Sequence, residues 1–291
     1  MKEIKRTLYA VLLFMFIFNI LGCKNSSSEE SITISGSSSM LPLIEISLEG
    51  FLQENPHYII NAQGGGSGTG ITQVYDKTVQ IGMSDVYAED KISEERAKEL
   101  YDNKIAVQGF GVVLNNSLPV NDISKENIQK IFNGDIKNWS EIGGPNEEIF
   151  VIHRPSSSGT RTAFVNSLLD GDGSLENDSI GATQDSNGAV LKSLKQHKGA
   201  ISYLSFSYLN LEEAKQNVHV VSINNVVPCS ENIINGTYDF WSYCHLYTRG
   251  RAKGLSEKFI NYIVSDNNKD KIYEIGFIPI NDIHINSKVS D

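Results

Sequence analysis

Four short segments of the sequence carry side chains and glycines that could bind a small anion. They are the serine run SSS at 37–39, the glycine-rich stretch GGGSGTG at 64–70, the tripeptide MSD at 83–85 and the segment HRPSSSGTR at 153–161. Each lies between a run typical of a strand and a pattern typical of a helix. Free amides at the start of a helix and the positive end of its dipole attract anions, and serine hydroxyls add donors. An anion site is one interpretation, and simple capping of the helices is the other.

The stretch GGGSGTG could hold a phosphate group, but it is not a nucleotide-binding loop. It lacks the lysine that reaches the terminal phosphates of a nucleotide, and it lacks the spacing of a dinucleotide-binding fingerprint. The open alternatives are a flexible glycine loop and an anion cradle that presents the hydroxyl of Ser67. In the second case we expect the glycines to leave room around Ser67, because glycine lets the backbone approach a neighbour closely.

The segment HRPSSSGTR combines a guanidinium with a serine and glycine turn. Arg154 ends a predicted strand, and a guanidinium can donate two hydrogen bonds to one oxyanion. Ser158, Gly159 and Thr160 follow at the start of a predicted helix and could add hydroxyl and amide donors. Arg161 in the first helical turn opposes the helix dipole, so it requires a negative partner nearby. The alternative is an ordinary capped helix with arginines on its surface.

Asp85 is the residue that would choose between anions. An ionised carboxylate only accepts hydrogen bonds, so it favours an anion that still carries a proton. Monohydrogen phosphate carries a proton near neutral pH and sulfate does not. A carboxylate that faced a fully deprotonated oxyanion would cost roughly 1 to 3 kcal/mol or more. Taken alone, Asp85 could instead cap the helix predicted around 91–101.

The elements that would position these segments alternate between strands and helices. After the first serine run, Ile44, Leu48, Phe51 and Leu52 form one apolar stripe at helical spacing. The preceding serines are good caps, and Pro42 suits the first turn of this helix. The repeated order of strand, turn and helix predicts an α/β fold in which ligands bind beyond the carboxyl ends of the strands.

The N-terminus has the features of a bacterial export signal. A basic start precedes an apolar stretch at 8–21 that is too short for a comfortable membrane span. The sequence ILGC resembles a bacterial lipobox, so we predict that residues 1–22 are a signal peptide and that Cys23 is lipidated. Residues 23–30 then form the lipidated end and a polar tether. The alternative is an ordinary signal peptide with a chance cysteine.

The composition limits the partners of the protein. The 291-residue chain has 40% hydrophobic residues, so it can bury a substantial core, and it is expected to form two lobes. Its formal net charge is −10, and removal of residues 1–22, with three basic and one acidic side chain, would make it about −12. A field of this sign argues against nucleic acid as a main partner, whereas a small anion in a pocket responds mainly to nearby donors.

The cysteines and histidines predict neither a metal site nor a cofactor. No metal-ligand spacing and no thiol nucleophile signature is present. If Cys23 carries lipid, Cys229 and Cys244 remain, and an extracytoplasmic domain permits a disulfide. The sequence leaves open whether these two residues meet.

Taken together and in order, five motifs resemble the phosphate-binding lipoproteins of bacterial ABC phosphate transporters, the PstS family. The motifs are SGSSSMLPL, QGGGSGTGI, IGMSD, IFNGDIKNWSEIGG and HRPSSSGTR, and the match extends from about residue 32 to the C-terminus. The resemblance implies a two-lobed periplasmic-binding-protein fold of type II, with the ligand cleft between lobes joined by two crossover segments. It also implies a monomeric, lipid-anchored domain outside the cytoplasm that delivers phosphate to a membrane permease. The segment at 238–250 departs from the family pattern.

The resemblance also implies roles for individual residues. Asp85 would accept the phosphate proton, and Arg154 would be the charge partner. Three serines in a row allow a shift of one residue, so either Ser38 or Ser39 could supply the first hydroxyl. The implied phosphate-binding residues are Ser38, Ser39, Ser67, Asp85, Arg154, Ser158, Gly159 and Thr160.

The predicted first lobe comprises residues 31–109 and 229–291, and the second comprises 110–228, with the chain crossing close to these boundaries. Three other functions stay open. The protein could bind another tetrahedral oxyanion, such as sulfate or molybdate, or it could be a surface lipoprotein with a role in adhesion or signalling. A serine hydrolase or phosphatase would need Ser67 or Ser158 beside a general base, and the sequence has neither G-x-S-x-G nor a metal cluster.

Overall fold

In the computed structural model, which describes residues 31–283, strands and helices alternate along the chain. The strands are β1 Ser31–Gly36, β2 Ile59–Gly64, β3 Ile81–Ser84, β4 Leu100–Asn115, β5 Asp122–Ile123, β6 Phe150–His153, β7 Ala182–Thr183, β8 Ala200–Ser205, β9 Val218–Val220, β10 Ser222–Ile223, β11 Trp241–Arg249 and β12 Phe277–Pro279. The helices are α2 Leu41–Glu54, α3 Ser67–Tyr75, α4 Glu94–Ala97, α5 Lys125–Asn133, α6 Gly159–Leu168, α7 Asn187–Gln196, α8 Phe206–Leu209, α9 Glu212–Asn217, α10 Ser230–Ile234, α11 Gly254–Ile263 and α12 Asp266–Glu274. Short 3₁₀ turns are η1 Ala88–Asp90, η2 Trp139–Ile142, η3 Gly173–Leu175 and η4 Ile280–Asp282.

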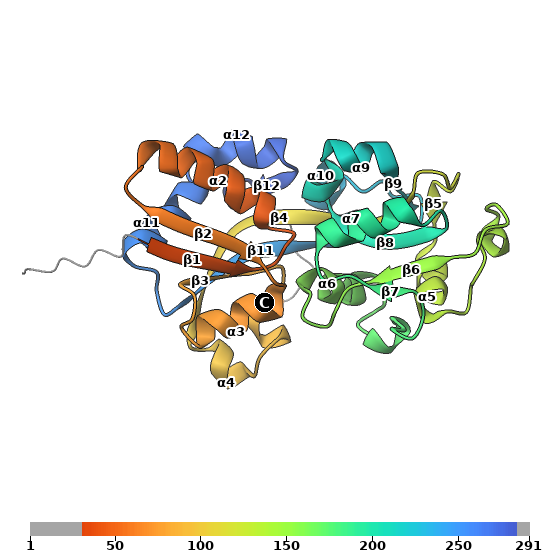
Figure 1. Cartoon of the computed structure of the whole chain (residues 1–291), viewed down its shortest axis with the longest axis horizontal. Coiled ribbons are helices and arrows are strands. Elements are labelled where there is room, and N and C mark those ends of the chain that lie inside the picture. Colours follow the sequence, from red (N-terminus) through yellow and green to blue (C-terminus); the bar gives the residue numbers. More distant parts are fainter. Residues whose placement is uncertain (1–30, 284–291) are drawn as a thin grey trace, which may run out of the picture.

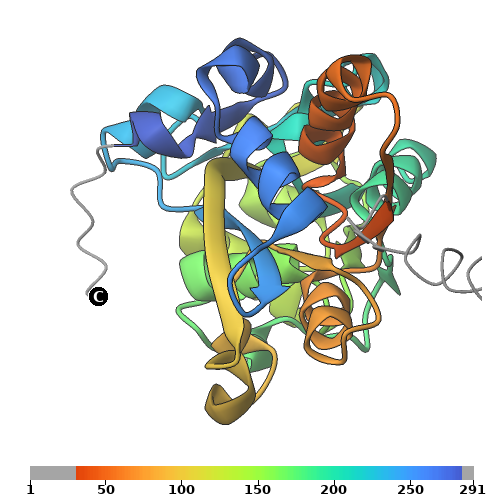
Figure 2. The same cartoon turned by 90° about the vertical axis from the view of Figure 1, so that its left-hand side faces the viewer.

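The strands form two parallel sets that two antiparallel strands join. The order across the sheet is β2-β1-β3-β11-β4-β8-β6-β7. β1 pairs parallel with β2 and β3 in one set, and β6 pairs parallel with β7 and β8 in the other. We call these halves the first and the second lobe (Figure 1). Helices cover both faces of each half (Figure 1), and Figure 2 shows this for the first lobe seen end-on. The predicted two-lobed α/β fold of type II is confirmed.

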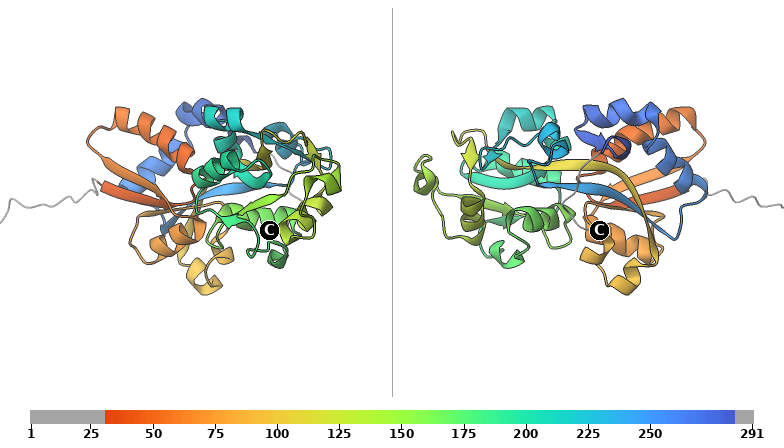
Figure 3. Two further views of the ribbon diagram at one scale, coloured as in Figure 1. Left: turned by 45° about the vertical axis from the view of Figure 1, so that its right-hand side comes forward. Right: turned by 180° about the vertical axis from the view of Figure 1, so that it is seen from behind.

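The long strand β4 runs through both lobes beside β11 (Figure 3). It pairs with β11 over residues 100–109 and with β8 over residues 110–114. The hydroxyl of Tyr238 donates to the carbonyl of Phe110 at 2.6 Å, and Phe240 packs in the same core cluster as second-lobe residues. These contacts favour a return crossing close to Phe240, while the lobe boundaries stay a prediction.

The helix α2 begins at Leu41 with Pro42 in its first turn, as predicted, but the serines do not cap it. Its N-cap is Met40, which already has helical backbone angles and makes no side-chain cap. A side-chain cap needs an extended residue at this position. The three serines at 37–39 are therefore available for contacts elsewhere.

Within the described part of the chain, no helix combines the length and the apolar character needed to cross a membrane. The predicted signal peptide, Cys23 and the whole predicted tether up to residue 30 lie outside the described residues.

Candidate functional site

The segments of the first lobe that are predicted to bind an anion come together because their strands are parallel neighbours. Gly36 at the end of β1 is in register with Gly64 of β2 and with Met83 of β3. The amide of Ser37 then donates to the carbonyl of Met83 at 3.0 Å. The three turns that follow these strands therefore leave the sheet at one edge, as expected for parallel strands.

Asp85 lies at the centre of a buried polar cluster. Its Oδ1 accepts from Ser39 Oγ at 2.6 Å and from Gln108 Nε2 at 2.6 Å, and its Oδ2 accepts from Thr160 Oγ1 at 3.1 Å. The backbone amide of Asp85 donates to Ser67 Oγ at 3.0 Å. The side chain is only 1% exposed. The interpretation of Asp85 as a helix cap is wrong, because α4 begins at Glu94 with Ser93 as its N-cap.

The helix α6 brings the second lobe against Asp85. Ser158 is its N-cap, and the Oγ of Ser158 accepts from the amide of Arg161 at 3.2 Å. Gly159, the first helical residue, faces the first lobe so closely that a Cβ there would lie 2.1 Å from Ser67 Oγ and 2.9 Å from Asp85 Cβ. Since no real Cβ tolerates such distances, only glycine fits this contact between the lobes.

Replacement of Gly159 by alanine is expected to weaken phosphate binding by at least about tenfold, because the added methyl prevents the lobes from meeting at Ser67. Each lobe should still fold, since an alanine is favourable within a helix. Isothermal titration with phosphate measures the affinity, and circular dichroism measures the fold. Gly188→Ala in α7 is the matched control, because a Cβ on Gly188 would have only one neighbour within 4 Å, the side chain of Tyr208 at 3.8 Å. Unchanged affinity in Gly159→Ala would contradict this prediction.

Arg154 is a buried cation with an unused donor. Its side chain is 1% exposed, Nε donates to Gln184 O at 3.0 Å and Nη2 donates to Asp185 O at 3.1 Å. Its buried Nη1 has no hydrogen-bond partner among the described residues. Burial lowers the pKa of Arg154, and the charges of Tyr203 and Asp85 partly oppose this shift. An arginine remains charged in proteins, and a buried charge requires compensation, so the surroundings suit an anion.

Ser38 and Ser39 make different contacts. Ser38 Oγ accepts from the amide and from Nδ2 of Asn187, both at 3.2 Å, whereas Ser39 Oγ donates to Asp85. Ser37 Oγ lies 2.8 Å from Ser39 Oγ, so it forms a hydrogen bond with the hydroxyl that donates to Asp85. The hydroxyl of Ser38, which accepts two donors from the second lobe, can still donate its own hydrogen.

The sequence interpretation missed Gln108 and Asn187, which are 1% and 0% exposed. Gln108 interrupts the apolar run of β4, and Asn187 opens α7. A polar residue within a buried apolar strand signals a partner, because an unpaired buried amide is costly. That signal does not say which partner.

Arg161 has the negative partners that its place in the first turn of α6 requires. Its Nε lies 3.0 Å from Glu176 Oε2, and its Nη1 and Nη2 donate to the Asp178 carboxylate at 2.8 and 2.9 Å. Burial by itself lowers the pKa of Arg161, but the Asp178 hydrogen bond and the Glu176 charge outweigh it and raise the pKa. Nη1 also donates to the carbonyl of Arg154 at 2.6 Å. Arg161 thereby ties the start of α6 to the strand end that carries Arg154.

The glycines at 64–70 do not simply leave room around Ser67. A Cβ on Gly70 would lie 2.5 Å from Ser35 O, so this glycine lets α3 pack directly on β1. Gly66 has φ +87° and, like Gly68, faces Ser157 of the second lobe. The residue that clears space at the hydroxyl of Ser67 is Gly159.

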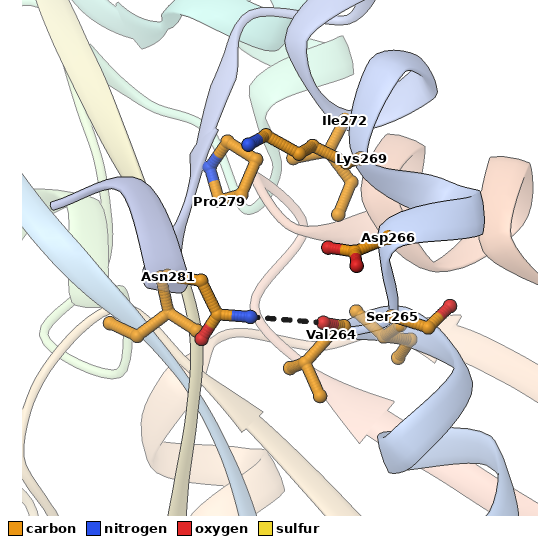
Figure 4. A pocket seen from close by; sticks show the side chains of 9 residues that line it. Val264, Ser265, Asp266, Lys269, Ile272, Pro279 and Asn281 are labelled. Atoms are coloured by element: carbon orange, nitrogen blue, oxygen red, sulfur yellow. Dashed lines mark hydrogen bonds between the residues drawn. The ribbon is translucent and has the colours of Figure 1, made fainter.

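Other features of the described residues lie outside this cluster. A hollow between α11, α12 and η4 is lined by none of the predicted phosphate residues, and Asn281 Nδ2 donates there to Val264 O at 3.3 Å (Figure 4).

Cys229 and Cys244 are free, so they form no disulfide. Burial raises the pKa of Cys244 well above its usual value, which makes it unreactive. Residues 31–283 contain no group of three or more histidine, cysteine or acidic side chains placed to hold a metal ion.

The proteins that this chain resembles in sequence belong to the same class as the fold described above. The family model of the PBP superfamily domain matches residues 24–267, so the fold and the match define a protein of that superfamily. The phosphate-binding protein PstS of Bacillus subtilis is 44% identical over 256 residues, which cover 88% of this chain and 82% of that protein. PstS of Borreliella burgdorferi is 26% identical over 278 residues, or 93% and 98% of the two chains. Within the superfamily, the chain belongs to the PstS family.

Solved structures show the same similarity. A structure described as a phosphate ABC transporter substrate-binding protein from Clostridium perfringens, with bound phosphate, has a TM-score of 0.77 at 26% identity. The alignment covers 86% of this chain and 99% of that one. An ABC-type phosphate transport receptor from Vibrio cholerae has a TM-score of 0.66 at 26% identity, covering 85% and 99%.

Proposed function

We propose that this protein captures inorganic phosphate outside the cytoplasm and delivers it to the permease of an ABC transporter. The observation that supports this most is the pairing of two buried groups of opposite charge, Asp85 in the first lobe and Arg154 in the second. They lie near enough for the charge of Asp85 to act on Arg154. The Nη1 of Arg154 has no hydrogen-bond partner among the described residues. The family to which the chain belongs supports the same ligand.

The proposed ligand is monohydrogen phosphate, held by donors on most sides and by one acceptor. Arg154 Nη1 and the start of α6 supply positive charge and donors. Ser67 Oγ and Ser158 Oγ each accept a backbone amide, so the hydrogen of each hydroxyl is available for an oxyanion. Asp85 would accept the proton that monohydrogen phosphate carries and sulfate lacks.

The same hydrogen bonds argue for a binding protein and against a hydrolase. Ser67 and Ser158 are the serines that a covalent mechanism would use. Each hydroxyl accepts from a backbone amide, and among residues 31–283 neither donates to a histidine or a carboxylate. An activated serine donates to a general base within hydrogen-bond reach. We therefore propose that the protein is not an enzyme and that phosphate leaves unchanged.

The proposed location is the outer face of the cell membrane. Removal of residues 1–22 and lipidation of Cys23 would leave the tether up to residue 30 between the membrane and β1. A tethered domain of this kind keeps the captured phosphate close to its permease. The domain itself is proposed to act as a monomer.

A titration of the unlipidated domain with phosphate, sulfate and molybdate tests the function. We expect phosphate to bind at neutral pH and sulfate to bind roughly 5-fold to 150-fold more weakly, the equivalent of about 1 to 3 kcal/mol for opposed acceptors. Calorimetry measures all three affinities. Equal affinity for phosphate and sulfate would overturn the assignment of phosphate and favour a less selective oxyanion carrier.

A further inference from the structure

Lys91 connects the two lobes beside the polar cluster of Asp85, and it has no role in the proposed ligand contacts. It follows η1, on the same turn of the first lobe that begins with Asp85. Its Nζ donates to Ser156 O at 2.7 Å, to Ser158 O at 3.2 Å and to Thr162 Oγ1 at 2.6 Å. An ammonium group has three hydrogens, so all its donors are used by the second lobe.

The partners of Lys91 belong to the turn that opens α6. In a trans peptide the carbonyl oxygen and the next amide hydrogen point in opposite directions. A cation that holds the carbonyls of Ser156 and Ser158 therefore turns the amides of Ser157 and Gly159 away from itself. Gly159 lies against Ser67 and Asp85, so its amide is on the side of the turn that faces the polar cluster of Asp85.

A second contact between the lobes reinforces the same turn. The amide of Gly68 in α3 donates to Ser157 O at 2.9 Å. Three consecutive carbonyls, from Ser156 to Ser158, are thus held by donors of the first lobe. The donor of Lys91 is a charged ammonium group, and hydrogen bonds from charged donors are stronger than those from neutral donors.

The position of Lys91 is unfavourable for a charged side chain, because the ammonium group is partly removed from water. Burial lowers the pKa of Lys91, and the charges of Asp90 and Asp85 oppose this while Arg161 adds to it. All three hydrogen-bond partners are uncharged groups of the second lobe. Within residues 31–283 no carboxylate forms an ion pair with this partly buried ammonium, so its hydrogen bonds to the second lobe are the contacts that compensate its charge.

We propose that Lys91 is a positioning residue that latches the closed lobes and orients the anion-facing amides at the start of α6. Lys91 acts on phosphate through the loop at 156–158 and does not touch it. This inference rests on the proposed function for its ligand. The latch itself is a contact between lobes and can be measured without phosphate.

The test compares Lys91→Met with the wild-type protein in two measurements. Stopped-flow binding of phosphate is expected to show a dissociation rate at least about tenfold faster in the variant, with a nearly unchanged association rate. Hydrogen exchange without phosphate is expected to show faster exchange in the peptides that contain Gly68 and residues 157–160. Lys91→Arg keeps a cation with several donors, so it should recover part of the slow dissociation.

Lys98→Met is the matched control, because Lys98 is exposed at the C-terminal end of α4 and pairs with Glu94. It should leave both measurements unchanged. A dissociation rate within twofold of wild type, together with unchanged exchange in Lys91→Met, would overturn the latch. If the wild-type protein did not bind phosphate, the proposed function would fail, and the exchange comparison would still decide whether Lys91 latches the lobes.

Discussion

Replacement of Asp85 by asparagine is expected to erase the preference for phosphate over sulfate. The carboxylate accepts from Ser39, Gln108 and Thr160 and would also accept the phosphate proton. An asparagine amide can present a donor at the same place, which suits a fully deprotonated oxyanion. The ratio of phosphate to sulfate affinity should therefore fall by roughly 5-fold to 150-fold, the equivalent of about 1 to 3 kcal/mol.

Calorimetric titrations of the variant with both anions measure this ratio. Asp76→Asn, at the exposed end of α3, removes the same charge from the first lobe without touching the cluster. It separates the local hydrogen-bond effect from the general effect of one negative charge. An Asp85→Asn protein that still favours phosphate as strongly as the wild type would exclude Asp85 as the proton acceptor.

Replacement of Arg154 by methionine is expected to have the largest effect on affinity. The guanidinium is buried, and in the part of the chain that the structure describes its Nη1 has no hydrogen-bond partner. Removal of a buried charge partner typically costs about 2 to 5 kcal/mol, or roughly 30-fold to several thousand-fold in Kd. Methionine keeps most of the side-chain volume, so the change acts mainly through charge and hydrogen bonds.

The loss should also appear in the stability of the protein with phosphate. A ligand at 100 times its Kd stabilises the native state by about 2.7 kcal/mol, and at the same phosphate concentration this gain should fall to about 0.9 kcal/mol or less in Arg154→Met. Denaturant unfolding with and without phosphate measures it. Arg251→Met, which removes an exposed arginine that stacks on Tyr101, should keep the full gain. Full phosphate affinity in Arg154→Met would refute the pocket and favour a surface lipoprotein with an adhesion or signalling role.

Much of the fold follows from local features of the sequence. The apolar stripe that includes Ile44 predicted α2, and the glycine after the run at 125–133 ends α5 in the left-handed conformation. Parallel strands send their turns to one edge, so the segments that carry Ser39, Ser67 and Asp85 could be expected to meet. The binding role of these residues stays a prediction that the variants above test.

Contacts between distant segments could not be predicted in this way. Gln108 reaches Asp85 because β4 passes behind the cluster, and Asn187 reaches Ser38 only because the lobes meet. Likewise, Met40 has helical backbone angles and takes the N-cap position of α2, so the expected serine cap does not form. Cys244 is buried in β11 and Cys229 lies at the start of α10, so the possible disulfide does not form. Each depends on how separate elements pack.

The sequence by itself therefore determined the order of the elements, the class of fold and the segments able to bind an anion, since turns, caps and apolar periodicity are local properties of the chain. Tertiary structure decided which donor faces which acceptor. The contact of Gly159 with Ser67 and the reach of Lys91 to Ser156 arise only when two lobes, each with its own core, close on one another. Hydrogen bonds act over about 3 Å, so they depend on this packing and cannot be read from spacing along the chain.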